Sequence, residues 1–394
     1  MNQLIASERQ RIRSIDILRG IVMIIMALDH VRDFFHSQAM IANPLDLKTT
    51  TSLLFFTRWI THFCAPVFVF LSGTSAYLSG RRKSKKALSL FLIKRGAWLV
   101  CVELIVITFA LTFDPFYSLI VLQVIWAIGV SMIILGVLIW LPFPVLVFIG
   151  LLICFGHNLL DYPSFSPKEK TSLWWLLIHS PFSPYTLSKT HFVLVAYAFM
   201  PWTGVMICGY CFGHLFEGDA KQRVRSCTYT GTVLIGLFII LRSINAYGDP
   251  VPWAVQRDGL FTFLSFINVT KYPPSLLYIC LTLGPALLFL GIIEKVQNRF
   301  TDVVSLYGRV PFFYYVIHFY LIHTLCLIAF FLWGYTSADI ANPASPFLFR
   351  PPSFGFPLMV VYLIWLFVVI IVYPACRRYD RYKSTHKQWW LSYL

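Results

Sequence analysis

The chain has 394 residues, of which 58% are hydrophobic and only 12% are charged. Soluble domains carry about 25% charged residues, so the composition excludes an ordinary soluble protein and indicates an all-α, polytopic integral membrane protein. No segment between the apolar runs is long enough for a soluble domain, so we expect a single membrane domain over residues 1–394. The formal net charge of +15 would suit nucleic-acid binding in a soluble protein.

Hydropathy predicts about ten transmembrane helices, since a helix needs about 20 mostly apolar residues to cross a bilayer. Two prolines in "LPFP" (Leu141–Pro144) favour a tight turn between the fourth helix and the fifth. The segment "SLWWLLIHS" (Ser172–Ser180) predicts a helix at the membrane interface, because tryptophan favours that depth. The predicted spans are 14–35, 53–78, 87–112, 118–141, 144–160, 191–215, 228–247, 275–293, 308–333 and 356–376.

The basic residues predict how these helices are oriented. If the N-terminus is cytoplasmic, most of the 32 lysines and arginines fall in short inner segments, as the positive-inside rule requires. An even number of spans then places the C-terminus in the cytoplasm too. Residues 1–13 form a cytoplasmic N-terminal segment and 377–394 a basic cytoplasmic tail. The excess of positive charge is therefore explained by topology, and we expect the bilayer, not nucleic acid, as the partner.

The first predicted span, "SIDILRGIVMIIMALDHVRDFF" (Ser14–Phe35), carries charges at both ends. Its apolar run from Gly20 to Leu28 covers roughly 13–14 Å, against about 30 Å for a bilayer core. Ionisable groups at membrane depth cost about 2.5–3.5 kcal/mol each, so they indicate function. The inner end contributes Asp16 and Arg19, and the outer end contributes Asp29, His30, Arg32, Asp33 and His36.

Helical spacing brings several of the outer groups together. Asp29 is three and four residues from Arg32 and Asp33, His30 is three from Asp33, and Arg32 is four from His36. A carboxylate beside a histidine fixes the tautomer and raises the basicity of the ring, as a general base requires. In the simpler alternative, the charges only pair with one another and cap the helix at the interface. The same alternative applies to the pair of Asp16 and Arg19.

Further polar groups lie at depth in other spans. In "TRWITHFCAPVFVFLSG", Arg58 and His62 are four residues apart and close in depth to His30. Gln123 lies in the fourth span. In "YGRVPFFYYVIHFYLIH", His318 is about 13–14 Å beyond Arg309 along the helix, with Tyr315 one turn before it. His62 and His318 could also be ordinary core histidines, and the spacing of His318 and His323 does not suit a metal, so we expect none.

Two groups of basic residues remain. Lys271, in "NVTKYPPSLLY", could bind an anionic acceptor or a carbonyl, or it could be an ordinary interfacial lysine. Near the inner side lie Arg81, Arg82, Lys94 and Arg95. These could bind phosphates, and membrane anchoring explains the Arg81 and Arg82 cluster equally well.

Several stretches together resemble the heparan-α-glucosaminide N-acetyltransferase-like family of bacterial membrane proteins. They are "RIRSIDILRGIVMIIMALDH", "HFCAPVFVFLSGTSAYLS", "VLQVIWAIG", "MPWTGVMICGYCFG", "NVTKYPPSLLY" and "SLYGRVPFFYYVIHFYLIH", and they run from Arg11 to beyond His323. The resemblance implies a transmembrane acyltransferase of the bacterial inner membrane. Such an enzyme moves an acetyl group from cytoplasmic acetyl-CoA to a sugar amine or hydroxyl outside the cytoplasm. It also makes a homodimer plausible.

The resemblance leaves three histidines as candidates for the general base. In the lysosomal enzyme, an asparagine stands about where His30 lies and the catalytic histidine is a little downstream, which points to His36. An aspartate of that enzyme's second span falls near His62. The bacterial O-acetyltransferases of the wider superfamily use a first-span histidine placed much like His30, which we therefore favour. Asp29 or Asp33 would orient it.

The remaining candidates follow from this mechanism. For substrate binding we expect Arg32, Arg58, Lys271, His318, Tyr315 and Gln123. For acetyl-CoA we expect Asp16, Arg19, Arg81, Arg82, Lys94, Arg95 and Arg309. In an alternative function, the same buried charges would relay protons in a transporter or flippase for a lipid-linked or small anionic substrate. The chain shows no inverted repeat of the kind that such transporters often have.

Overall fold

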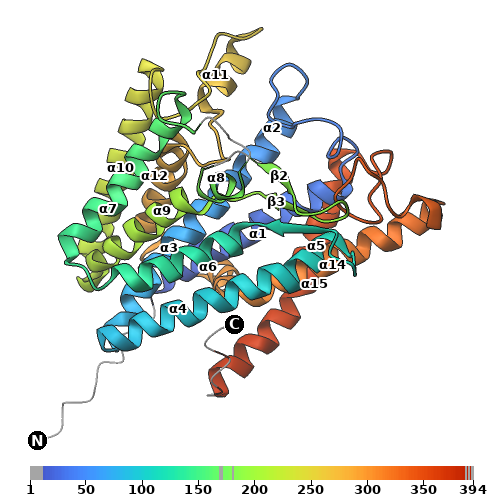
Figure 1. The fold of residues 1–394 in the computed structure, drawn as a ribbon. Helices are drawn as coiled ribbons and strands as arrows, with labels where there is room; N and C mark the ends of the chain where they lie inside the picture. The colour runs from blue at the N-terminus through green and yellow to red at the C-terminus, as the bar shows by residue number, and fades with distance from the viewer. Residues whose placement is uncertain (1–11, 168–171, 180–181, 387, 389–390, 392–394) are drawn as a thin grey trace, which may run out of the picture.

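The computed structural model describes residues 12–394 except 168–171, 180–181, 387, 389–390 and 392–394. The described chain is mostly helical, with 69% helix and 4% strand, and its long helices lie side by side (Figure 1). The helices are α1 (Arg13–Phe35), α2 (Ser52–Trp59), α3 (Cys64–Gly80), α4 (Lys85–Val102), α5 (Thr108–Thr112), α6 (Val124–Leu138), α7 (Phe143–Gly156), α8 (Leu173–His179), α9 (Phe199–Phe212), α10 (Ala220–Ile244), α11 (Gly259–Ile267), α12 (Leu276–Ile293), α13 (Arg299–Arg309), α14 (Pro311–Leu332) and α15 (Leu358–Thr385).

Short segments of other helix types continue some of these helices. The 3₁₀ turn η1 (Ile60–Phe63) joins α2 to α3, and the π-helical segment η2 (Glu103–Ile107) joins α4 to α5. Further 3₁₀ turns are η3 (His157–Asp161), η4 (Gly213–Glu217) and η5 (Ser337–Asp339). Breaks of this kind inside a helix are frequent at functional sites, because they turn side chains away from the regular helical face.

Among the described residues, six helical segments are long and apolar enough to cross a membrane. They also expose apolar side chains, among them Ile239 and Ile240 of α10 and Leu363 and Ile370 of α15. This pattern fits an integral membrane protein, since lipid is the solvent that accepts such a surface. The six run over Ser52–Gly80, Phe143–Asp161, Ala220–Ile244, Leu276–Ile293, Pro311–Leu332 and Leu358–Thr385. The count of ten spans and the cytoplasmic placement of both termini stay predictions, as does the assignment of residues 1–13, which lie almost wholly outside the described part.

The prediction of an all-α chain is wrong in one region, where a small sheet forms. Strands β1 (Leu119–Leu122), β2 (Ser183–Thr186) and β3 (Phe192–Val195) lie in the order β1-β3-β2, with β1 parallel and β2 antiparallel to β3. The predicted spans 118–141 and 191–215 therefore begin as strands, and their helices start only at Val124 and Phe199. Short apolar runs such as "LIVL" and "FVLV" carry no periodicity that separates strand from helix.

Two glycines bring α1 and α13 into backbone contact. A Cβ atom on Gly20 would lie 1.9 Å from the carbonyl oxygen of Val304, and one on Gly308 would lie 1.8 Å from that of Asp16. Small residues allow this close approach of helices in membrane proteins. The contact fixes α1, which carries the charged groups of the predicted site.

We expect Gly20→Ala to destabilise the protein, because the new methyl group overlaps the α13 backbone. Overpacking typically costs about 1–3 kcal/mol. The measurement is the thermal unfolding midpoint of the purified protein in detergent. Gly236→Ala in α10 is the matched control, since a Cβ there meets nothing within 4 Å and should leave the midpoint unchanged. Equal midpoints for the two variants would contradict the packing described here.

Candidate active site

His30 on α1 and His318 on α14 are in direct contact. The Nδ1 atom of His30 lies 2.7 Å from Nε2 of His318. The ring of Phe319 stacks on His30 at a centroid distance of 4.1 Å, and Tyr315 meets the same ring edge-on at 6.4 Å. The imidazole of His30 is therefore held in a fixed orientation by residues of α14.

The hydrogen bond of the second ring nitrogen of His318 determines which nitrogens of His318 and His30 carry a proton. Nδ1 of His318 lies 2.9 Å from the backbone carbonyl of Tyr314. A carbonyl only accepts, so this nitrogen carries the proton and donates it, which leaves Nε2 of neutral His318 as an acceptor. His30 must then donate from Nδ1, and its Nε2 carries the free lone pair. Nε2 of His30 makes no hydrogen bond within the described residues, so its lone pair has no partner there.

The carboxylates near His30 bind arginines instead of the histidine. Asp29 accepts from Arg58 at 2.5 Å and from Arg32 at 2.9 Å, and Arg32 also donates to Asp33 at 2.7 Å. The pair of Asp29 and Arg32 is the one that helical spacing predicts, whereas the contact of Arg32 with the adjacent Asp33 was not expected from spacing. The orientation of His30, however, comes from His318, which sequence spacing did not indicate.

His62 lies in the 3₁₀ turn η1, next to this network. Its side chain is buried, with 1% exposure of the residue, and neither ring nitrogen has a hydrogen-bond partner. Its backbone carbonyl accepts from the hydroxyl of Tyr278 at 2.7 Å. The charges of Arg58, Lys271 and Asp29 act on the ring. His62 is thus a neighbour of the ion-pair network with two unused hydrogen-bonding atoms.

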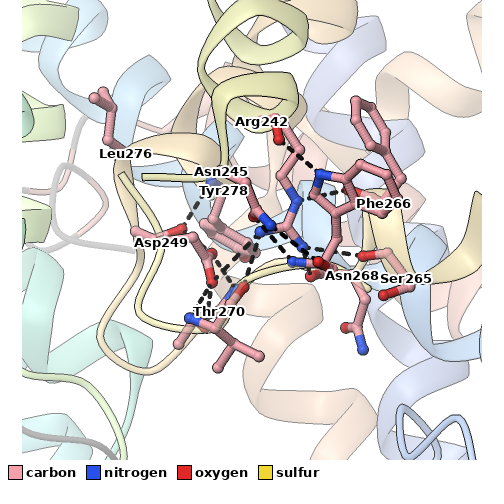
Figure 2. A network of polar contacts seen from close by, with 12 residues as sticks. Arg242, Asn245, Asp249, Ser265, Phe266, Asn268, Thr270, Leu276 and Tyr278 are labelled. Carbon is pink, nitrogen blue, oxygen red and sulfur yellow. Dashed lines mark hydrogen bonds and ion pairs between the residues drawn. The ribbon is translucent and has the colours of Figure 1, made fainter. Parts of the chain in front are cut away.

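Arg242 of α10 supports the loop that carries Lys271. Its guanidinium group is buried and donates to the carbonyl oxygens of Val251, Phe266, Ser265 and Asn268 at 2.7–3.0 Å (Figure 2). These hydrogen bonds satisfy carbonyl groups at the end of α11 and in the loops on either side of it. Arg242 therefore holds α11 and the segment after it in place.

Asp249 holds the next part of the same loop. Its carboxylate accepts from the backbone N–H of Thr270 at 2.8 Å and from the hydroxyl of Ser275 at 2.6 Å, and Ser275 caps the N-terminus of α12. Figure 2 shows this carboxylate beside Thr270, with Arg242 nearby. Lys271 and Tyr272 lie between these two anchored residues. The contacts of the loop fix the positions of Lys271 and Tyr272, although the loop sequence has no helical periodicity.

Lys271 lies among aromatic rings. Only 8% of the residue is exposed, and its ammonium group lies 5.8 Å from the centroid of Tyr197 and 5.1 Å from that of Tyr272. Its charge acts on Asp29, His30 and His62. Of the predicted substrate-binding residues, His318 contacts His30 directly, and Arg32 and Arg58 bind Asp29, which precedes His30 in α1.

His36 is held differently from His30. It follows the end of α1, and its backbone carbonyl accepts from the fully buried Arg350 at 2.6 Å. Burial lowers the pKa of His36, and the guanidinium groups of Arg32 and Arg350 lower it further. The residue is 7% exposed, whereas the exposure of His30 is intermediate.

Tyr315 lies against His30, whereas Gln123 contacts Glu103. The backbone N–H of Gln123, at the start of α6, donates to the carboxylate of Glu103 in η2 at 3.0 Å. The hydroxyl of Tyr315 is buried without a partner, and so is one carboxylate oxygen of Glu103. The position of Gln123 thus depends on Glu103.

The predicted acetyl-CoA residues are divided among several contacts. Arg19 lies 3.7 Å from Asp16 and binds Leu71 and Ser75 of α3. Arg81 lies 3.3 Å from Glu217, and Arg309 binds Asp380 of α15 at 2.8 Å. Arg82 follows the C-terminus of α3, and Lys94 and Arg95 lie on α4. Arg19, Arg81 and Arg309 therefore each pair with a different carboxylate.

Sequence reasoning missed the residues that support the site. Phe319, Tyr197, Tyr272 and Tyr278 looked like ordinary aromatic residues of a membrane protein, and Arg350 lay in an outer loop without a motif. A buried arginine at 0% exposure has no signature in the sequence. Within the described residues, no group of three or more His, Cys, Asp or Glu side chains could hold a metal ion.

The family comparison adds an independent finding. The family model for "Heparan-alpha-glucosaminide N-acetyltransferase, catalytic" matches residues 11–243. The match includes His30, Arg58 and His62 and ends before Lys271 and His318, so the resemblance of those later segments rests on the sequence alone. No curated protein matches the chain significantly. Since the matched residues make up more than half of the chain, this membrane protein belongs to the heparan-α-glucosaminide N-acetyltransferase family.

Proposed function

We propose that this protein transfers an acetyl group from cytoplasmic acetyl-CoA to an amine or hydroxyl of a sugar outside the cytoplasm. The family indicates a membrane acetyltransferase. The observation that supports the catalytic role best is the hydrogen bond between His30 and His318. It leaves the lone pair of His30 Nε2 free for the acceptor, and a positioned base of this kind contributes about 10²–10⁴-fold to a rate.

The proposed reaction balances with His30 as a proton carrier. The amine or hydroxyl of the acceptor loses its proton to His30 Nε2 as its nitrogen or oxygen attacks the thioester carbonyl of acetyl-CoA. The C–S bond then breaks, and the proton passes to the departing CoA sulfur. Products are the acetylated acceptor and CoA. An oxyanion develops at the carbonyl oxygen, and Arg58 or Arg32 would stabilise it.

The donor side of the proposal rests on residues near the opposite end of α1. Asp16, Arg19, Arg81, Arg82, Lys94, Arg95 and Arg309 are proposed to border the path of acetyl-CoA. In this proposal the chain forms one domain in a bacterial inner membrane, has both termini in the cytoplasm and assembles as a homodimer. His36 and His62 are the alternative bases.

The family match does not favour the alternative of a transporter or flippase.

A transfer assay tests the function. Purified full-length protein is incubated with radiolabelled acetyl-CoA and a panel of amino sugars and glycans. We expect label to appear in at least one acceptor, together with an equal amount of free CoA thiol. A protein that neither binds CoA nor releases it with any acceptor of the panel would refute the proposal.

A further inference from the structure

Two cysteine side chains from different helices meet between α7 and α9. The Sγ atom of Cys154 in α7 lies 3.9 Å from that of Cys208 in α9. Both thiols are free, and Cys154 is buried whereas the exposure of Cys208 is intermediate. The two residues are 54 positions apart in the sequence, so the packing of the helices brings them together. The proposed reaction gives neither thiol a role.

Two glycines place the sulfur atoms opposite each other. Gly150 precedes Cys154 by four residues, and Gly204 precedes Cys208 by the same spacing. A Cβ atom on Gly150 would lie 3.1 Å from the sulfur of Cys208 and 3.3 Å from its backbone nitrogen. A Cβ atom on Gly204 would lie 3.1 Å from the sulfur of Cys154. Each glycine therefore faces the cysteine of the other helix, and the two backbones approach closely, as a disulfide between helices requires.

The contact with α9 holds α7 in the fold. Among the described elements outside its own continuation into η3, α7 packs chiefly on α9. Its remaining surface is apolar and exposed, as at Phe148 and Leu152. A covalent bond between α7 and α9 would therefore fix a peripheral helix to the body of the protein.

The C-terminal end of α7 also supports the start of α12. In η3, which continues α7, Nε2 of His157 lies 2.8 Å from the carbonyl oxygen of Pro274. The side-chain oxygen of the next residue, Asn158, accepts from the backbone N–H of Leu276 at 2.8 Å. Pro274 and Leu276 belong to the segment that follows Lys271 and opens α12. Fixing α7 would thus also fix one support of this segment.

We propose that Cys154 and Cys208 form a site of reversible oxidation, at which hydrogen peroxide converts the two thiols into a disulfide. The more exposed thiol, Cys208, attacks the O–O bond, gains one oxygen as a sulfenic acid and releases water. The sulfur of Cys154 then displaces that oxygen as a second water, and the S–S bond forms. Two thiols are oxidised and one peroxide is reduced to two waters. A thiol reductant reverses the change by exchange.

Peptide mapping tests the site. Full-length protein in detergent is treated with hydrogen peroxide, free thiols are blocked with N-ethylmaleimide, and the unreduced digest is analysed by mass spectrometry. We expect a peptide that links Cys154 to Cys208 and disappears after treatment with dithiothreitol. Oxidation of the exposed Cys101 in the same digest shows that the peroxide acted. A digest in which Cys154 and Cys208 carry only maleimide, or in which Cys208 is a sulfinic acid without the link, would overturn the proposal.

Variants identify the partner of Cys208. Cys154→Ser should abolish the link and leave Cys208 as a sulfenic acid that dimedone traps. Cys211→Ser is the matched control, because Cys211 lies on the same helix at intermediate exposure, and this variant should keep the link. A disulfide between Cys208 and Cys211 in the unmodified protein would show that their C-x-x-C spacing decides the pairing, and it would overturn the assignment to Cys154.

The thermal unfolding midpoint tests whether the disulfide fixes α7. Oxidised protein should unfold at least about 2 °C above reduced protein, since a cross-link restricts the unfolded chain. Hydrogen exchange of the backbone in residues 150–161 should also become slower. Cys154→Ser should show neither change after the same treatment. If the cross-linked protein has the midpoint and the exchange of the reduced protein, the disulfide does not fix α7 and that part of the inference is wrong.

Discussion

Replacing His30 with alanine is expected to lower the rate of acetyl transfer by about 10²–10⁴-fold, because no other group would then take the acceptor proton at this place. His30 has the free Nε2 lone pair and the fixed tautomer that a base requires. The loss should appear in kcat more than in the KM for acetyl-CoA, since His30 is not among the residues predicted to bind acetyl-CoA. The measurement is steady-state transfer of labelled acetyl groups to the best acceptor of the panel.

Two further variants make this prediction specific. His30→Asn keeps much of the side-chain volume against Phe319 and should lose activity as His30→Ala does, which separates chemistry from a packing defect. His191→Ala removes an exposed loop histidine and should be as active as the unmodified protein. If His30→Ala keeps full activity while His36→Ala or His62→Ala loses it, the base is assigned to the wrong residue.

Sequence reasoning identified the local parts of the site because they follow helical periodicity. The spacing of Asp29 and Arg32 predicts their ion pair, which the structure contains. The cost of burying charge directed attention to the first helix, and the role of its residues in a reaction stays a prediction. These predictions depend on residues within a few positions of one another, or on a single residue at an unusual depth.

The contacts between distant segments were not predictable from one sequence. His30 and His318 are 288 residues apart, and spacing within a helix gives no information on which helix lies opposite. The choice of a carboxylate as the partner of His30 followed from the nearest residues in sequence, whereas helix packing supplies His318. The small sheet was missed for a similar reason, since its strands pair only through segments distant in the chain.

His318→Leu is expected to lower kcat by about 10–100-fold with little change in KM, because it removes the acceptor that fixes the tautomer of His30. Without Nε2 of His318, the Nδ1–H group of His30 loses its partner, and the proton can move to the nitrogen that faces the acceptor. His318→Gln can still offer an amide oxygen to Nδ1–H, so it should recover part of the lost rate. Leucine keeps the site apolar, which limits damage to the packing around Tyr314 and Phe319.

A spectroscopic measurement separates positioning from a structural role for His318. With ¹⁵N-labelled histidine, the unmodified protein should show His30 as one neutral tautomer, protonated at Nδ1. His318→Leu should shift the ¹⁵N signals of His30 toward a mixture of tautomers, while the thermal midpoint stays close to that of His318→Gln. If the leucine variant loses activity but leaves the His30 signals unchanged, His318 does not act through the tautomer. If both variants are fully active, the histidine pair has no part in the reaction.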